Sequence, residues 1–189
     1  ERLRSSGQLT TFARLIEGRK ERSGQLSLWQ RYSFADLPIE LISHIYQLFV
    51  TDTASSVYTP PFLVRTMLSE VLSWDRLDRL IETNEVILDP AWGSGVFLVE
   101  AYKRLILHWR SRNDWKAPSK AVLQRLLAHV HGCDIEQGAV ELATFSLCLA
   151  LCDALEPAHI RSSIRLFPEL QHKTIHHSCF FDALERDCF

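Results

Sequence analysis

Two aspartates close short apolar runs, and each is followed by a turn and a helical pattern. Asp89 ends the run Glu85-Val-Ile-Leu-Asp89 and leads into Pro90-Ala-Trp-Gly93-Ser-Gly95, whereas Asp134 ends the run that starts at Ala128. In a parallel sheet, ligands bind where the carboxyl ends of strands meet helix N-termini. Glycines in such a turn let the backbone bend sharply and approach a ligand without a Cβ atom in the way. The pattern therefore predicts a ligand site at these strand ends.

The spacing of the glycines indicates which kind of ligand this is. A pyrophosphate dinucleotide site prefers Gly-x-Gly-x-x-Gly with an acid about 20 residues further on. Here Leu98 takes the place of the third glycine, and Asp134 lies nearly twice as far beyond Gly95. Acids at both strand ends favour a cationic cofactor without phosphate, with Asp134 accepting hydrogen bonds from ribose hydroxyls. Two simpler interpretations stay open: a plain tight turn at Gly93, and Asp134 as the cap of the helix that begins near Glu136.

Helical patterns alternate with the predicted strands. Thr59 and Pro60 provide an N-cap and a first-turn proline for one helix, and a cap near Ser119 precedes another that runs to Leu127. The long apolar helix from Gln137 to Leu155 ends before Pro157. The first helix should bury the residues that recur on one of its faces, Leu63, Val64, Met67, Leu68, Val71 and Leu72. The helix after Gly95 should likewise bury Phe97, Leu98, Ala101, Leu105 and Trp109.

The alternation predicts an α/β fold. Strands over 85–89, 128–134 and 173–177 separated by helices imply βαβ units with right-handed crossovers and a parallel sheet covered on both faces. Upstream, apolar residues recur at helical spacing from Pro38 onward, at Leu41, Ile42, Ile45, Leu48 and Phe49. We expect a helical N-terminal extension over 1–50 and a cofactor-binding domain over 51–189.

Composition limits the partners. The 21 basic and 23 acidic side chains give a net charge of -2, which argues against strong electrostatic binding of nucleic acid by this chain alone. No apolar stretch approaches the roughly 18 residues of a membrane span, so we expect a soluble cytoplasmic protein without a membrane partner. Five cysteines suggest free thiols in a reducing compartment. The spacing of His176, His177, Cys179 and Cys188 does not support a zinc site, and we expect no metal.

Three motifs resemble a known family. Residues 89–98 read Asp-Pro-Ala-Trp-Gly-Ser-Gly-Val-Phe-Leu, which resembles the first cofactor motif of adenine-specific (N-6) DNA methyltransferases of restriction-modification systems, with Trp92 in place of the usual cysteine. Val57-Tyr-Thr-Pro-Pro61 resembles the Tyr-Thr-Pro motif that precedes the first strand in these enzymes. Gly132-Cys-Asp-Ile-Glu136, followed by Ala139-Val-Glu-Leu-Ala143, resembles their second motif. The order and spacing of all three make the resemblance specific.

The resemblance implies a partial Rossmann-like, doubly wound sheet that binds S-adenosylmethionine. The Tyr-Thr-Pro segment would contact the methionine end, Asp134 the ribose and Ile135 the adenine ring. Cys179 stands where the family has an acid that takes the adenine amino group; Phe180 follows it and Asp182 lies three positions on. The implied cofactor-binding residues are Tyr58, Thr59, Pro60, Asp89, Pro90, Ala91, Gly93, Ser94, Gly95, Phe97, Asp134, Ile135, Cys179 and Phe180.

The family's catalytic motif is absent from the 189 residues. That motif, Asn-Pro-Pro followed by an aromatic residue, holds the target amino group of a base flipped out of the duplex. The sequence ends Asp187-Cys-Phe189, as if cut at the start of the strand that precedes this motif, so we expect an excerpt of a longer polypeptide with no catalytic residue of its own. Double-stranded DNA would bind through parts of the parent protein missing here, and strand 86–88 should keep one unpaired edge.

Three alternatives to this function remain. The parent could be another methyltransferase with the Asn-Pro-Pro motif, acting on a protein glutamine amide or on RNA. The chain could also be a non-catalytic binding module of the same fold. An unrelated dinucleotide-binding dehydrogenase domain is the third alternative. The sequence does not indicate an oligomeric state or the DNA sequence recognised.

Overall fold

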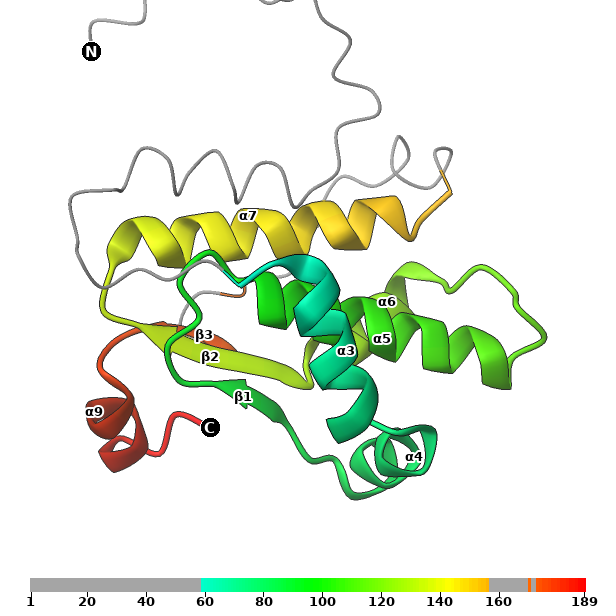
Figure 1. The fold of residues 1–189 in the computed structure, drawn as a ribbon, viewed down its shortest axis with the longest axis horizontal. Helices are drawn as coiled ribbons and strands as arrows, with labels where there is room; N and C mark the ends of the chain where they lie inside the picture. The colour runs from blue at the N-terminus through cyan, green and yellow to red at the C-terminus, as the bar shows by residue number, and fades with distance from the viewer. Residues whose placement is uncertain (1–58, 157–169, 171–172) are drawn as a thin grey trace, which may run out of the picture. The chain divides into compact units, whose positions relative to one another are not determined.

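Three short strands form one parallel sheet at the centre of the structure. The computed structural model describes residues 59–156, 170 and 173–189 (Figure 1). Strands β1 (Ile87–Asp89), β2 (Val130–Asp134) and β3 (Ile175–His177) lie in the order β1-β2-β3. The register pairs Asp89 with Gly132 and Asp134 with His177, so the carboxyl ends meet at one edge. The predicted α/β architecture with a parallel sheet is confirmed, although each strand is shorter than predicted.

Six helices surround this sheet in the described residues. They are α3 (Pro61–Val71), α4 (Trp74–Thr83), α5 (Val96–Arg112), α6 (Lys120–Leu127), α7 (Gln137–Asp153) and α9 (Phe180–Glu185). The predicted cap of α6 is confirmed, because the Ser119 hydroxyl accepts the Val122 N–H. The predicted cap of α3 is wrong by one residue: Pro60 is the N-cap, makes no side-chain cap bond, and leaves the first helical position to Pro61. Within the described ranges, no helix is long and apolar enough to cross a bilayer.

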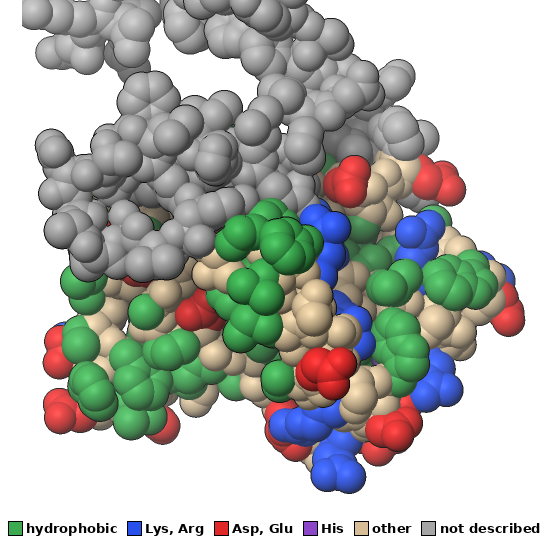
Figure 2. All heavy atoms as spheres, viewed as in Figure 1, with side chains coloured by type: hydrophobic (Ala, Val, Ile, Leu, Met, Phe, Trp, Pro, Cys, Tyr) green, Lys and Arg blue, Asp and Glu red, His purple; other side chains and the backbone are tan. Residues whose placement is uncertain are grey.

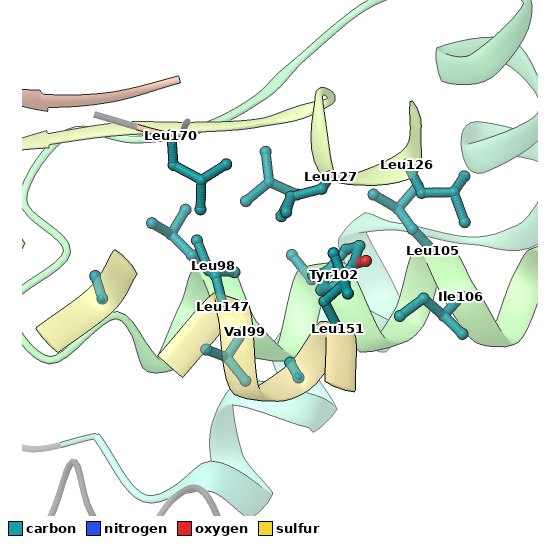
Figure 3. Close-up of a cluster of buried hydrophobic side chains, with 14 of the residues drawn as sticks. Leu98, Val99, Tyr102, Leu105, Ile106, Leu126, Leu127, Leu147, Leu151 and Leu170 are labelled. Atoms are coloured by element: carbon teal, nitrogen blue, oxygen red, sulfur yellow. The ribbon is translucent and has the colours of Figure 1, made fainter. Parts of the chain in front are cut away.

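Helices α5 and α7 form the core against one face of the sheet. Figure 3 shows their leucines packed together with leucines of α6 and with Leu170. Val130 and Ile175, one from each of two neighbouring strands, are fully buried in the same cluster. The hydroxyl of Tyr102 donates to the Leu123 carbonyl at 3.0 Å, which satisfies the polar end of a buried ring. Burial also raises the pKa of Tyr102, so the ring stays neutral and links α5 to α6.

Helix α3 buries a narrower face than predicted. Val64 and Leu72 are buried and Leu68 is half-buried, so the buried residues recur every four positions along one stripe. The expected burial of three others is wrong, since these keep 42%, 47% and 69% of their surface exposed: Leu63, Met67 and Val71. A helix that packs against one neighbour covers only such a stripe. Figure 2 shows hydrophobic side chains gathered over α3 on the visible face.

The sequence patterns did not reveal α4. Ser73 caps it through the Arg76 N–H, and Leu77 and Leu80 are buried beneath it. Its outer face is anchored by charge, because the Asp78 carboxylate lies 2.9 Å from the Nε2 atom of His108 and also pairs with Arg112, both on α5. Figure 2 shows basic and acidic side chains interspersed around this helix. The many polar residues of α4 therefore belong to the outer surface of a helix that packs on α5.

The second face of the sheet carries a different set of side chains. Because side chains alternate along a strand, His131, Cys133 and His176 point away from α5 and α7. The ring of Phe189 covers this face, with its centroid 6.4 Å from that of His131 and 5.5 Å from that of His176. In the described residues, α9 and Phe189 pack against this face.

Strand β1 lies at the open side of the sheet. In the described residues it pairs with β2 alone, and the unpaired edge of this strand stays a prediction for the whole chain. A pocket of about 310 Å³ lies beside it, lined mainly by apolar side chains of α3, β1 and α5, among them Val71, Leu88 and Phe97. An unpaired strand edge can accept another strand through its free N–H and C=O groups.

Two glycines in the turn after β1 differ in what surrounds them. Gly93 and Gly95 both have positive φ, at +53° and +78°, which disfavours any side chain. A Cβ atom on Gly95 would lie 2.8 Å from the Cβ of Ala143, whereas one on Gly93 would have no atom within 4 Å. Gly95 therefore sets how closely α5 approaches α7.

We predict that Gly95→Ala destabilises the protein more than Gly93→Ala. Both changes place an alanine in a left-handed conformation, which costs about 1 kcal/mol. Gly95→Ala also overpacks the contact with Ala143, which costs about 1 to 3 kcal/mol more. Urea unfolding of both variants measures the difference. Equal loss of stability in the two variants would show that α7 shifts freely and that the contact does not constrain the helix pair.

Candidate functional site

The carboxylate of Asp134 joins two segments at the carboxyl ends of the strands. Its Oδ2 atom accepts the N–H of Gly93 at 2.8 Å, and its Oδ1 atom accepts the N–H of Glu136 at 2.9 Å. The backbone carbonyl of the same residue accepts the N–H of Ser178 at 2.9 Å. One residue thus connects the turn after β1, the start of α7 and the end of β3.

The simpler interpretation, Asp134 as the cap of the following helix, is wrong, because Glu136 is the N-cap of α7 and no side chain caps that helix. The bond from the Glu136 N–H to Asp134 instead closes a local turn just before the helix. The bond from Gly93 spans 41 positions and has no counterpart in a helix cap. A carboxylate has about four acceptor positions, so two N–H bonds leave lone pairs for hydroxyl donors. The half-buried side chain can therefore hold the turn and the start of the next segment and accept a ligand as well.

Asp89 lies near Asp134, and the pKa of its carboxyl is raised. Burial raises the pKa of the Asp89 carboxyl, the N–H of Ala91 at 3.2 Å from Oδ1 opposes this, and the negative charge of Asp134 raises the pKa further. Two carboxylates that repel one another at one edge favour a positively charged ligand, because such a ligand removes the repulsion.

The turn between the two aspartates is partly buried and partly exposed to solvent. Ser94 and Gly95 are buried, whereas Ala91 and Gly93 are exposed. Since a Cβ on Gly93 would meet nothing within 4 Å, a ligand can approach the backbone there. The backbone of the turn is therefore accessible next to the Asp134 carboxylate.

Trp92 fills the space beneath the turn. Only 3% of its surface is exposed, and a Cβ on Gly132 would lie 2.3 Å from the Cε3 atom of its ring. The indole thus packs against the backbone of β2, at a position where only glycine fits. Its Nε1 atom is buried without a hydrogen-bond partner in the described part of the chain. Trp92, which stands where the resembling motif usually has cysteine, therefore forms part of the core under the site.

Other predicted residues lie at the start of α3 and in the pocket beside β1. Thr59 and Pro60 are half-buried at the start of α3, and Tyr58 lies outside the described residues. Pro90 and Phe97 line the pocket beside β1 together with Asp89. The structure brings Asp89, Gly93 and Asp134 together.

Cys179 and Phe180 lie at the start of α9, next to a cluster of aromatic rings. Cys179 is the N-cap of α9, and the ring of Phe180 stacks on that of Phe189 with centroids 6.3 Å apart and planes inclined by 24°. Phe180 also meets the ring of Phe181 edge-on. The role of Phe180 in this aromatic cluster is therefore observed, whereas its stacking on a cofactor stays a prediction.

His177 is a residue of this edge that the sequence patterns missed. It ends β3, and its Nε2 atom lies 2.9 Å from the carbonyl oxygen of Ile135, whose side chain is 68% exposed. The signal available in the sequence was its place at the end of a predicted strand, two residues before Cys179, which stands where the resembling family has an acid. In the described residues, no group of three or more His, Cys, Asp or Glu side chains gathers as a metal site.

Comparison with known proteins identifies relatives of this chain. Residues 39–170 match the family described as N-6 DNA Methylase. A protein of Methanocaldococcus jannaschii named "Putative type II restriction enzyme and methyltransferase" is 33% identical over 103 residues, which are 52% of this chain and 8% of that protein. The methylase subunit of a type I restriction enzyme of the same organism is 28% identical over 124 residues, which are 58% of this chain and 19% of the subunit. No solved structure matches.

The family match contains both aspartate strand ends and the turn between them. It extends over more than half of the sequence and includes every helix and strand from α3 to α7. The chain spans only a small part of the two relatives, so their further regions have no counterpart in it. On the extent of this match, the chain belongs to the N-6 DNA methylase family.

Proposed function

We propose that this chain is the S-adenosylmethionine-binding part of a DNA adenine N-6 methyltransferase of a restriction-modification system. One observation carries the proposal: Asp89 and Asp134 lie at adjacent strand ends, and Asp134 accepts the N–H of Gly93 in the turn between β1 and α5. The arrangement suits the topology of a Rossmann-like methyltransferase, in which a cofactor binds across the carboxyl ends of the central strands.

The residues present fit this cofactor. Burial raises the pKa of Asp89, and the charge of Asp134 raises it further. S-adenosylmethionine carries a sulfonium and an ammonium group, and either positive charge would favour the ionised form of Asp89 beside Asp134. The open backbone at Gly93 gives access to the turn, and the free lone pairs of Asp134 suit ribose hydroxyls. Ile135 offers an apolar side chain for the adenine ring. When bound, the cofactor supplies an electrophilic methyl group, and these residues hold and orient it.

DNA recognition and catalysis belong, in this proposal, to other parts of a longer protein. The two relatives are named as a restriction enzyme and methyltransferase and as a methylase subunit, and the chain corresponds to 8% and 19% of them. The sequence contains no Asn-Pro-Pro segment. Its net charge of -2 offers little of the phosphate attraction that dominates binding to DNA. Asp89 and Asp134 thus serve the methyl donor.

We predict that S-adenosylhomocysteine, the demethylated product, binds this chain and that Asp134→Ala weakens binding by about 1 to 3 kcal/mol, because charge-assisted hydrogen bonds to the ribose are lost. Isothermal calorimetry measures the affinity. A ligand without the two ribose hydroxyls should bind the variant and the unchanged protein equally, since the lost bonds are those to the hydroxyls.

The matched control is Glu136→Ala, which removes a neighbouring negative charge and leaves the Asp134 carboxylate in place. This control should change the affinity little. If Asp134→Ala weakens both ligands to the same extent, the carboxylate only maintains the turn at Gly93 and the ribose has been placed wrongly.

We predict that Asp89→Asn stabilises the free protein above the ordinary pKa of aspartate, near 4. The folded state raises the pKa of Asp89, so the folded protein binds the proton more tightly than the unfolded chain. Stability contributed by the protonated group is therefore present at low pH and is lost as the pH rises through the raised pKa. Asparagine stays neutral and can still accept the N–H of Ala91.

Thermal unfolding from about pH 4 to about pH 8 checks this, and the gain of the variant should grow with pH. The same variant should bind the cationic methyl donor more weakly. A lower melting temperature than that of the unchanged protein at the upper end of this range would contradict the prediction.

We predict that this chain binds the methyl donor but transfers no methyl group to DNA. In the proposed function Asp89 and Asp134 serve the methyl donor, and the sequence contains no Asn-Pro-Pro segment to hold an extruded adenine amino group. Incubation with a tritiated methyl donor and mixed-sequence duplex DNA measures transfer, with a longer parent protein that contains an Asn-Pro-Pro-aromatic segment as the positive control. Label incorporated by the 189-residue chain would overturn the assignment of catalysis to other regions.

A further inference from the structure

A second pocket lies beside the end of β3 and the end of α9. Its volume is about 440 Å³, and its lining residues come from two segments of the chain, 173–178 and 186–188. We call it the β3–α9 pocket. In the described part of the chain, neither Asp89 nor Asp134 belongs to its lining. The proposed cofactor site therefore does not account for this pocket.

Basic side chains predominate in the β3–α9 pocket. Lys173 and Arg186 each contribute a positive charge, one from each segment, and His176 and His177 add two imidazole rings. Among the described lining residues, Asp187 has the only carboxylate. None of the ion pairs between described residues involves Arg186 or Asp187. The pocket is thus locally positive in a chain whose net charge is -2.

The last turn of α9 is closed by hydrogen bonds next to this pocket. Carbonyl oxygens at a helix C-terminus carry partial negative charge and would repel an anion. Here the carbonyls of Asp182, Ala183 and Leu184 accept the N–H groups of the three residues that follow the helix, 186–188. Because these carbonyls already have donors, the charged side chains dominate the electrostatics of the pocket.

We propose that the β3–α9 pocket binds the phosphate group of a phosphate ester, with Arg186 and Lys173 as its main partners. A guanidinium presents parallel N–H donors that match two phosphate oxygens, and an ammonium adds a compact positive charge. Cations from two segments suit a tetrahedral group with charge on several oxygens better than a planar carboxylate. The volume lies in the range of sites for small organic ligands, so the pocket has room for the group that carries the phosphate.

The phosphate can belong to a free small ester or to a nucleic-acid strand, since both present the same oxygens. The inference does not depend on the proposed function, because it uses other residues. Lys173 and Arg186 are exposed, so salt screens their attraction for an anion, and the titrations must be made at constant ionic strength.

The test begins with inorganic phosphate. Backbone amide signals of ¹⁵N-labelled protein are followed during a titration with phosphate, while sodium chloride keeps the ionic strength constant. Signals of the residues that line the pocket should shift and reach saturation. Arg186→Gln should weaken binding by about threefold to tenfold, as expected for the loss of a charge-assisted hydrogen bond at an exposed site.

Two further variants separate a specific site from a general charge effect. Asp187→Asn should strengthen phosphate binding, because it removes the opposing carboxylate. Asparagine tolerates the left-handed backbone at this position, where φ is 55°. The matched control is Arg125→Gln, which makes the same change of charge at an exposed arginine of α6 outside the pocket. This control should leave the affinity for phosphate unchanged.

Two esters then identify the source of the phosphate. If the ligand is part of a nucleic acid, a short single-stranded DNA should shift the same amide signals and displace phosphate. If it is a free small ester, ribose 5-phosphate should do so and the DNA should not. Either result supports the pocket as a phosphate site.

Other results would overturn the proposal. These are the absence of saturable shifts, an equal loss of affinity in Arg125→Gln and Arg186→Gln, or no gain in Asp187→Asn. Asp134→Ala should leave the phosphate titration unchanged, and a loss of phosphate binding in that variant would show that the pocket is not separate from the cofactor site. Failure of S-adenosylhomocysteine to bind while phosphate still binds would overturn only the proposed function.

Discussion

The arrangement of the candidate site depends on the hydrogen bonds of Asp134. Its carboxylate holds the N–H of Gly93 and the N–H of Glu136, and its carbonyl holds the N–H of Ser178. The three donors come from the turn after β1, the start of α7 and the end of β3. A buried or half-buried N–H group needs an acceptor, and one residue at the end of the central strand provides it for all three segments. A ligand at this edge therefore meets backbone that is already in position.

Close packing beneath the turn keeps this edge rigid. Gly95 lets α5 approach Ala143 of α7, and Gly132 lets the ring of Trp92 lie against β2. A side chain at either glycine would separate these elements, because the surrounding atoms leave no room for a Cβ. Above the turn the situation is reversed, since the space around Gly93 is open. Tight packing on one side of the turn and exposed backbone on the other allow a small ligand to bind backbone groups without displacing the surrounding elements.

The sheet is asymmetric in the described residues. Its α5 and α7 face has a large apolar core, whereas the opposite face carries histidines and Cys133 under α9 and Phe189. Beside β1 lie an unpaired edge and an apolar pocket of about 310 Å³. The parts matched by this chain are 8% and 19% of the two relatives. Our proposal assigns DNA binding and methyl transfer to such further regions and assigns the methyl donor to the aspartate edge.

Local patterns in the sequence determined the three strands, the helices α3, α5, α6 and α7, the two aspartate ends and the glycine turn, because periodicity, caps and turn residues act over a few positions. They did not reveal α4 or α9. The spacing of motifs also pointed to the family. Tertiary structure alone decided the narrow buried stripe of α3, the burial of Trp92 against Gly132 and the stacking of Phe180 on Phe189. It also brought His177 to the Ile135 carbonyl, 42 positions away. The contact of His177 arises only when β2 and β3 pair. No local pattern encodes which distant backbone group a side chain will meet.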